Sequence, residues 1–387
     1  MGQPFLTDRL QGFGNTIFGE MSALALATGS VNLGQGFPDT DGPTEVLEAA
    51  VSAIREGRGN QYPPAIGVPE LRHAIVAHQK RFYDLTFDAE TEVLVTCGAT
   101  EAIASVLLSM LSTGDEVIAF EPFYDSYAAC ISMAGAKRVG VTLYAPDYAL
   151  DLDALRKAIT PRTRMLLLNT PHNPTGKVFT RNELDAIAAL AVEHDLLVMA
   201  DECYEHLVFD GAHIPIVTLP GMRERTITVG SGGKTFSVTG WKVGWITSTP
   251  ELVSAVRCSK QFLTYVSSGP FQYAIAVGLG LPDSYFSAFT DNLRLRRDML
   301  SAGLEKAGFD VMPTQGTFFL TADITPLGGT DGLEFCRELP HRCGVVAVPT
   351  QVFYDNVEAG RRLVRFAFCK KLDVLDEACR RLEGLRS

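Results

Sequence analysis

The stretch TITVGSGGKTFS, residues 226–237, is the most informative part of this chain. Its apolar beginning, Thr226 to Val229, predicts a buried strand, and Lys234 follows among small and partly hydroxylated residues. Such surroundings leave room for a ligand and keep water scarce. They lower the pKa of an amine from its usual value of about 10.4 and make the amine a nucleophile toward an aldehyde. A second cation, Lys242, follows eight positions later.

Two other interpretations of Lys234 remain open at this point. A nucleotide-binding P-loop also contains Gly-Lys-Thr, but it needs a glycine at the position that Thr228 occupies here. A nucleotide phosphatase is therefore disfavoured. An exposed loop lysine is the default interpretation of Lys234 taken alone, so further residues must decide.

Two more predicted strands lead to polar residues at their carboxyl ends, where ligands bind in parallel sheets. The apolar run 164–168 leads into a turn-rich loop in which prolines flank Asn173. The run 196–200 leads directly to Asp201 and, three residues later, to Tyr204. Each has an ordinary structural alternative: an Asn-Pro turn without a ligand, a helix N-cap aspartate, and a packed tyrosine.

A further strand, predicted over 93–96, is followed by a glycine turn and an apolar helix predicted over 102–111. Free backbone N–H groups and the helix dipole favour an anion at such a helix start. Ala99 and Thr100 are therefore candidates for binding a phosphate. A plain capped helix with Glu101 in its first turn explains the pattern equally well.

Near the C-terminus, residues 361–368 alternate polar and apolar side chains in their second half, as a half-buried strand does. Burial of Arg365 in that strand is tolerable only beside a bound anion or in an ion pair. A guanidinium suits a carboxylate, and each charge-assisted hydrogen bond contributes about 1.5 to 3 kcal/mol. A surface ion pair is the alternative for Arg365 taken alone.

Together, and in this order, the motifs resemble those of the fold-type I aminotransferases of class I and II, which depend on pyridoxal 5'-phosphate (PLP). The resemblance runs from about residue 18 to about residue 382. It implies that Lys234 is catalytic and holds PLP as a Schiff base, with Asp201 and Tyr204 as its catalytic partners. In this family the aspartate pairs with the pyridine nitrogen, while the asparagine and the tyrosine, here Asn173 and Tyr204, donate to the phenolic oxygen.

The resemblance assigns further residues to each ligand. Beside Asn173, Asp201, Tyr204 and Lys234, the cofactor-binding residues are Tyr62, Ala99, Thr100, Tyr124, Ser231 and Lys242. Among them Tyr124 stacks on the ring, Lys242 binds the phosphate, and Tyr62 reaches the phosphate of a neighbouring subunit. The substrate-binding residues are Gly36, Asn173 and Arg365, with Arg365 on the α-carboxylate. A homodimer that shares its active sites between subunits is therefore expected.

The expected fold is α/β, because strands alternate with helical patterns from about residue 45 to about residue 280. A doubly wound, mostly parallel sheet would form a large PLP-binding domain over residues 45–284. Residues 1–44 and 285–387, which include a helical pattern over 293–307, would form a smaller α+β domain. At 387 residues the chain is long for one core, which agrees with two domains.

Composition argues against several kinds of partner. A net charge of −11 without a lysine or arginine cluster argues against nucleic acid. The eight cysteines contain no C-x-x-C pair and the seven histidines no H-E-x-x-H spacing, so no metal site is predicted and the thiols are expected to be reduced. No signal segment or long apolar run is visible, so a cytoplasmic protein without a membrane partner is expected.

The resemblance predicts a ping-pong transfer of an amino group from an L-amino acid to a 2-oxo acid. Residues 34–39, 121–127 and 240–245 look most like the branch that contains actinobacterial N-succinyldiaminopimelate aminotransferases and the kynurenine, glutamine and methionine transaminases. Lys242, where aspartate aminotransferases usually have arginine, favours that branch. The favoured couple is N-succinyl-L,L-diaminopimelate with 2-oxoglutarate, a step of lysine biosynthesis. A kynurenine, glutamine or methionine transaminase, a cysteine-conjugate β-lyase and a non-catalytic binding protein are the alternatives.

Overall fold

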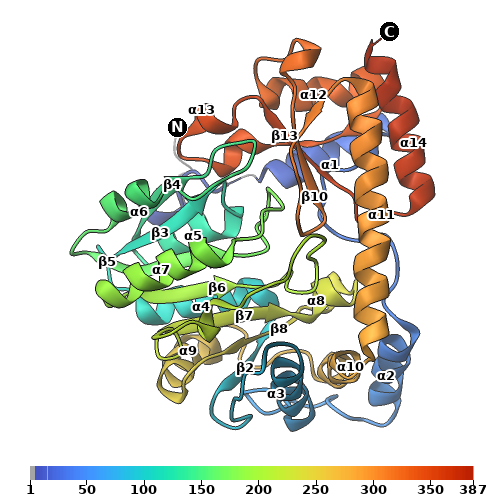
Figure 1. Cartoon of the computed structure of the whole chain (residues 1–387). Coiled ribbons are helices and arrows are strands. Elements are labelled where there is room, and N and C mark those ends of the chain that lie inside the picture. The colour runs from blue at the N-terminus through green and yellow to red at the C-terminus, as the bar shows by residue number, and fades with distance from the viewer. Residues whose placement is uncertain (1–4, 15, 387) are drawn as a thin grey trace.

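The computed structural model describes residues 5–14 and 16–386, and a seven-stranded sheet forms its centre (Figure 1). In spatial order its strands are β2 (Val93–Cys97), β8 (Val243–Thr247), β7 (Thr226–Ser231), β6 (Leu197–Asp201), β5 (Thr163–Asn169), β3 (Glu116–Glu121) and β4 (Lys137–Thr142). Of these seven strands, only β8 runs antiparallel to its neighbours. The sheet is therefore mostly parallel, which confirms the predicted α/β class.

The apolar runs that predicted strands all lie in this sheet, and their ends differ from the prediction by at most two residues. Strands such as β3 and β7 are buried along their whole length, which explains why they read as continuous apolar runs. The predicted helix 102–111 begins earlier, since α4 spans Gly98–Met110 and starts directly at the end of β2. The predicted helix 293–307 is only the second part of α11 (Asp283–Ala307), because the first ten residues are mostly exposed or partly buried and give no strong apolar pattern.

Helices cover both faces of the central sheet, because alternate strand residues point into separate cores. One face packs against α4, α5 (Asp125–Met133) and α9 (Pro250–Leu263). The other face packs against α6 (Leu152–Ala158) and α7 (Arg181–Glu193) and, near β2 and β8, against α2 (Thr44–Arg55), α3 (Pro69–Tyr83) and α10 (Gly269–Leu279). This arrangement is the doubly wound sheet that the alternating pattern predicted.

A second, antiparallel sheet contains β12 (Val348–Pro349), β13 (Leu363–Ala367), β10 (Phe319–Asp323) and β9 (Asp310–Val311). Around it lie α1 (Ile17–Thr28), α12 (Gly332–Cys343), α13 (Val357–Gly360) and α14 (Leu372–Glu383), and β1 (Val31–Asn32) pairs with β11 (Val345–Val346). The N-terminal arm is thus paired with the C-terminal region. Division of the chain at residues 44/45 and 284/285 stays a prediction.

The long helix α11 links the two parts of the molecule. Figure 1 shows it running from α2 and α10 at one end to α12 and α14 at the other. Although α11 has 25 residues, its sequence is rich in charged side chains. Among the described residues, no helix is both long enough and apolar enough to cross a membrane.

Candidate functional site

A pocket of about 300 Å³ collects nearly all the predicted site residues. It lies where the carboxyl ends of β5, β6 and β7 face β10 and β13 of the second sheet. The predicted residues in its wall are Gly36, Ala99, Thr100, Tyr124, Asn173, Asp201, Tyr204, Ser231, Lys234, Lys242 and Arg365. Residues more than 300 positions apart in the sequence therefore line one cavity.

Lys234 lies in the one-turn helix α8 (Gly232–Thr235), which follows β7 without a loop. Its Nζ is 5.7 Å from the ring centroid of Tyr204 and 5.4 Å from that of Phe318. Loss of contact with water lowers the pKa of this amine from its usual value, although the carboxylate of Asp201 opposes that shift. The amine is thus neutral over a wider pH range than a free lysine, as a nucleophile or base must be.

Asp201 ends β6 and is buried. Its Oδ2 accepts a hydrogen bond from the hydroxyl of Tyr127 at 2.6 Å, and its Oδ1 accepts one from the backbone N–H of Cys203 at 3.3 Å. Burial and the charge of Asp201 hold the pKa of Tyr127 well above its usual value, so this phenol stays a donor. Within the described residues Asp201 forms no ion pair, and the carboxylate therefore keeps the capacity to bind a cationic ring nitrogen.

Arg365 lies in the middle of β13 and is only 2% exposed. Its Nη1 donates to Oδ1 of Asn173 at 3.1 Å and its Nη2 to the carbonyl of Gly34 at 3.0 Å, while its guanidinium lies 4.1 Å from the ring centroid of Phe319. Burial lowers its pKa to about 10. Its Nε has no hydrogen-bond partner, and no carboxylate in the described part of the chain pairs with it. This buried cation is therefore available to an anionic ligand.

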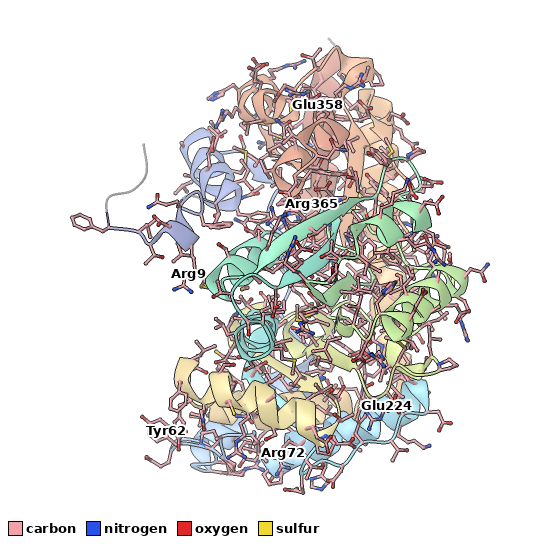
Figure 2. All side chains as sticks on the ribbon, turned by 90° about the vertical axis from the view of Figure 1, so that its left-hand side faces the viewer. Arg9, Tyr62, Arg72, Glu224, Glu358 and Arg365 are labelled. Atoms are coloured by element: carbon pink, nitrogen blue, oxygen red, sulfur yellow. The ribbon has the colours of Figure 1, made fainter. Side chains whose placement is uncertain are left out.

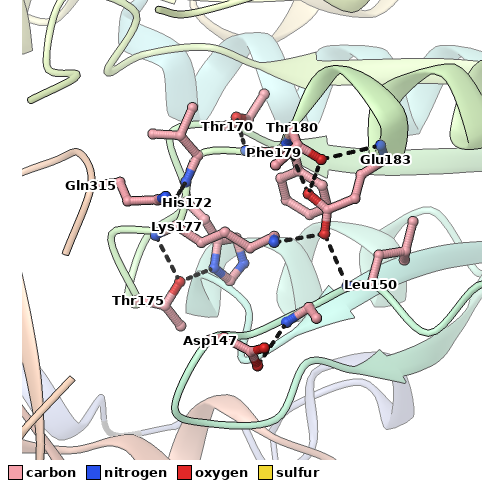
Figure 3. Close-up of polar contacts among 12 residues, drawn as sticks. Asp147, Leu150, Thr170, His172, Thr175, Lys177, Phe179, Thr180, Glu183 and Gln315 are labelled. Carbon is pink, nitrogen blue, oxygen red and sulfur yellow. Dashed lines mark hydrogen bonds and ion pairs between the residues drawn. The ribbon is translucent and has the colours of Figure 1, made fainter. Parts of the chain in front are cut away.

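The loop that presents Asn173 is held from both sides. The backbone N–H of Asn173 donates to the side-chain oxygen of Asn169 at 2.8 Å, and the amide nitrogen of Asn169 donates to the backbone carbonyl of Asp201 at 2.9 Å. Figure 3 shows the contacts behind the loop: the His172 ring with Thr175 at 2.7 Å, Lys177 with Glu183 at 2.7 Å, and Thr180 with Glu183 in a capping box at the start of α7. The position of Asn173 is thus set by hydrogen bonds to two neighbouring strands.

The opposite end of the pocket suits a phosphate. Gly98 starts α4 with a φ of +74°, and a Cβ at this position would lie 3.1 Å from both Cε and Nζ of Lys242. The ammonium of Lys242 therefore stands directly beside the free N–H groups of the first turn of α4, to which Ala99 and Thr100 belong. With Ser231 in the same wall, this donor set fits a phosphate group, and together with Lys234 and Asp201 the pocket fits PLP.

Tyr62 is the predicted site residue that the structure places elsewhere. Its side chain is 81% exposed and lies outside the pocket, where its ring packs edge-on against Tyr265 at 5.5 Å. Figure 2 shows Tyr62 at the surface of the molecule, away from Arg365. Within one chain it contacts no part of the site, and its role toward a neighbouring subunit stays a prediction.

Several pocket residues were not predicted from the sequence. Tyr127 lies in the first turn of α5, three positions after Tyr124, the N-cap residue of this helix, and this short spacing could have identified it. The remaining unpredicted residues with side chains in the wall include Phe18, Gln35, Phe37, Asn169 and Phe319. Phe18 and Phe319 lie in apolar segments that read like any core segment, whereas Phe37 lies in segment 34–39, whose resemblance to the family could have identified it.

A second group of polar residues lies outside the pocket. His78, Glu205 and His206 bring possible ligand atoms within 4.8 Å of one another, from segments too far apart in sequence to show a metal-binding spacing. The two imidazoles meet through their Nε2 atoms at 2.7 Å, and burial lowers the pKa of His78 to about 3. The rings therefore hydrogen-bond to each other and join α3 to the segment after β6.

Comparisons with known proteins agree with this geometry. Residues 28–382 match the family model described as aminotransferase class I and II. The chain is 52% identical to the probable N-succinyldiaminopimelate aminotransferase of Mycobacterium tuberculosis, over 97% of this chain and 98% of that protein. The solved structure of the N-succinyldiaminopimelate aminotransferase from that organism superposes with a TM-score of 0.96, covering 98% of this chain and all of the other. The methionine aminotransferase of Escherichia coli is 37% identical over 97% of each chain.

The two lines of observation converge on one conclusion. The pocket contains a lysine amine of lowered pKa, a buried aspartate and an unpaired arginine, and the similarity extends over nearly the whole chain. The chain therefore belongs to the family of class I and II aminotransferases and is a PLP-dependent enzyme.

Proposed function

We propose that the amino acid on which this enzyme acts is N-succinyl-L,L-diaminopimelate, with 2-oxoglutarate and glutamate as the other couple, in lysine biosynthesis. The observation that supports this most directly is the 52% identity to the protein of Mycobacterium tuberculosis. Identity falls to 37% with the methionine aminotransferase of Escherichia coli and to 36% with the kynurenine–oxoglutarate transaminase 3 of the mouse. Both are therefore weaker guides to the substrate.

The residues of the pocket have separate tasks toward the cofactor. Asp201, Asn173 and Tyr204 would hold the ring of PLP and Tyr124 would lie against it, while Lys242, Ser231, Ala99 and Thr100 would bind the phosphate. Bound in this pocket, PLP would supply an electron sink for the negative charge that forms at the substrate Cα. The hydrogen bond from Tyr127 keeps the carboxylate of Asp201 in one orientation for this purpose.

Arg365 and Lys234 act on the substrate itself. The guanidinium of Arg365 binds the α-carboxylate, with Asn173 and the backbone at Gly36 beside it, and so fixes which face of the Cα meets Lys234. The amine of Lys234 takes the Cα proton, since burial lowers its pKa and so favours the neutral form that a base requires, and it gives a proton back later in the same half-reaction. Phe18 and Phe319 border the site and limit the access of water.

We also infer that the enzyme is a cytoplasmic homodimer that takes only small-molecule partners, without nucleic acid or membrane. Tyr62 lies outside its own pocket and packs against Tyr265, and both rings are exposed, as is Phe262 three positions before Tyr265. An exposed aromatic cluster of this kind suits a subunit interface. The eight cysteines are all free thiols, as expected in a reducing compartment.

An absorbance titration of the holoenzyme tests the substrate. N-succinyl-L,L-diaminopimelate, glutamate, kynurenine, glutamine and methionine are added singly without an acceptor, and the decay of the visible cofactor band is followed. We expect the fastest conversion with N-succinyl-L,L-diaminopimelate. A faster conversion with kynurenine or methionine contradicts the proposed substrate and leaves the reaction class intact. Pyruvate and ammonia formed from a cysteine conjugate without acceptor would reveal a β-lyase.

Substitution of the lysine tests the mechanism. Lys234→Ala removes the proton carrier and the covalent link to the cofactor, so turnover should fall by at least about 10²-fold while the fold persists. Lys306→Ala is the matched control, because Lys306 is exposed and pairs only with Glu383 at 2.8 Å. Transamination retained in the Lys234 variant refutes the assignment.

A further inference from the structure

A second cavity of about 320 Å³ lies between α11 and the segment 38–43. It adjoins the catalytic pocket at two places. Phe318 lines the second cavity, and Nζ of Lys234 lies 5.4 Å from the centroid of its ring. Phe37 lines the catalytic pocket, whereas the next residue, Pro38, lines the second cavity. The ring of Phe318 and the segment at Phe37 and Pro38 therefore lie near both spaces.

Arg296 is the one cation among the described residues that line this cavity. Its Nε is buried and has no hydrogen-bond partner. The neighbouring arginines of α11 are satisfied, because Arg294 pairs with Asp291 at 2.6 Å and Arg297 pairs with Asp210 at 3.1 Å. The unpartnered Nε of Arg296 is thus a property of its position rather than of the helix.

The remaining wall combines apolar and neutral polar groups. Apolar surface comes from Tyr285, Phe289 and Leu293, and hydrogen-bonding groups come from Thr40, Ser237 and Asn292. One carboxylate, Asp41, also lines the cavity, and Asp39 lies within electrostatic reach of Arg296, yet neither forms an ion pair with it. A short methylene chain that bears an amide and a terminal carboxylate matches this wall: apolar surface for the chain, polar groups for the amide, and a guanidinium for the carboxylate.

We propose that this cavity is a carboxylate subsite in which Arg296 binds the terminal carboxylate of an amide-linked acyl chain. The N-succinyl arm of the substrate has this chemistry. Phe37 lines the catalytic pocket and the adjacent Pro38 lines the second cavity, so this segment marks the side on which the arm would extend from the catalytic pocket. The assignment rests on the proposed function. A free dicarboxylic half-amide has the same chemistry and is the other source of such a ligand.

Steady-state kinetics of the holoenzyme distinguish these sources. In Arg296→Gln we expect the KM for N-succinyl-L,L-diaminopimelate to rise about tenfold, with kcat and the constants for glutamate unchanged, because only the long donor reaches the guanidinium. Arg294→Gln is the control on the same helix and should leave the KM unchanged. Succinamate, which contains the amide and the carboxylate alone, should inhibit the wild type more strongly than Arg296→Gln. Weaker inhibition in the variant with an unchanged donor KM would identify the free acid as the ligand.

The outcomes also separate this subsite from the proposed function. The subsite is refuted if two quantities are unchanged in every Arg296 variant: the KM for the N-succinyl donor and the inhibition by succinamate. That result leaves the proposed substrate intact. If the wild type does not accept the N-succinyl donor, the proposed substrate is wrong. Calorimetric binding of succinamate to the wild type and to Arg296→Gln then tests the subsite alone. Equal affinities of the two proteins refute the subsite. Arg296→Lys makes the same comparisons if Arg296→Gln does not fold, with a smaller expected change because lysine lacks the two-point contact.

Discussion

At the scale of single residues, the site depends on charged groups whose interactions within the protein are incomplete. Arg365 is 2% exposed, donates to two neutral oxygens and has a free Nε. Burying a cation without a counter-charge costs free energy. This arrangement therefore lowers the stability of the free protein and favours binding of a carboxylate. The lowered pKa of Lys234 has the same physical origin, because the site has little water.

Replacing Arg365 tests this account. Arg365→Leu removes the charge-assisted hydrogen bonds to the α-carboxylate, and the KM for the amino acid should rise by about 10- to 100-fold. The melting temperature should not fall, because the variant also removes an unpaired buried cation. Steady-state kinetics and thermal unfolding measure the two effects.

The neighbouring Arg362 provides the control, since it is exposed. Arg362→Leu should leave the KM unchanged. An unchanged KM in Arg365→Leu as well would show that the substrate carboxylate binds elsewhere.

At the scale of secondary-structure elements, the first turn of a helix and the loop after a strand position the side chains of the site. Helix α4 starts at Gly98, whose positive φ turns the chain directly from β2 into the first helical turn. The absence of a side chain there leaves room for the amine of Lys242 beside the helix N-terminus. In the Asn173 loop, hydrogen bonds around His172 and Lys177 perform a similar positioning task.

Gly98→Ala should weaken cofactor binding. The new methyl group would lie 3.1 Å from the Lys242 amine and displace it from the phosphate-binding end of the pocket, so the dissociation constant for PLP should rise by about tenfold or more. Gly114→Ala is the matched control, because Gly114 also has a positive φ (+93°) but open space around its Cβ position. Both variants should lose about 1 kcal/mol of stability from backbone strain, and only Gly98→Ala should lose PLP affinity in a titration. Equal PLP affinities would contradict the assigned phosphate site.

His172 predicts a pH dependence of stability. Burial lowers its pKa in the folded protein to about 3, from an ordinary value near 6.5. Below pH about 6.5 the unfolded chain binds a proton at His172 that the folded protein does not bind. The contribution of His172 to stability is therefore fully present above this pH and is lost as the pH falls toward 3. Between pH 6.5 and pH 5, protonation of this histidine in the unfolded chain should lower the free energy of unfolding by about 2 kcal/mol.

Denaturant unfolding at these two pH values measures the effect. His172→Gln should reduce the loss of stability between pH 6.5 and pH 5, whereas His194→Gln, at an exposed position, should not. An identical pH dependence in wild type and His172→Gln would mean that the imidazole is protonated in the folded protein.

At the scale of the whole molecule, the pocket exists only because two sheets and the N-terminal arm meet. Asp201 and Lys234 come from the central sheet, Arg365 comes from the second sheet, and Gly34 comes from the arm that pairs with β11. In the proposed dimer, the exposed Tyr62 would add a further part to the site of the neighbouring subunit.

Mixing two inactive variants tests this inference. Tyr62→Ala should lose PLP affinity and Lys234→Ala should lose turnover. If Tyr62 acts across the interface, subunit exchange produces hybrid dimers with one intact site, and about a quarter of all sites should become active. If no activity returns although native mass measurements show hybrids, Tyr62 does not act across the interface. A Tyr62→Ala variant that keeps full PLP affinity and turnover by itself would show that Tyr62 has no role in the site.

The local sequence by itself determined the strands, the doubly wound arrangement and most of the pocket. A strand buried on both faces must be apolar throughout, and polar residues at the ends of parallel strands meet at one edge of the sheet. Lys234, Asp201, Tyr204, Asn173 and Arg365 could therefore be singled out as candidates from the segments around them, and the family resemblance supplied their expected roles. Helix starts were less predictable. Helix α4 begins with Gly98, Thr100 and Glu101, which give no apolar pattern although two of them are buried, and the first turns of α11 are mostly exposed or partly buried.

Only the tertiary structure decided which side chains fix these groups. Tyr127 donates to Asp201 across 74 positions of sequence, and Arg365 meets the carbonyl of Gly34 across 331. The tertiary structure likewise places Arg296, with its unpartnered Nε, at the wall of a second cavity. Contacts between distant segments depend on how helices and sheets pack. The sequence of either segment alone does not show which residue of the other segment it contacts.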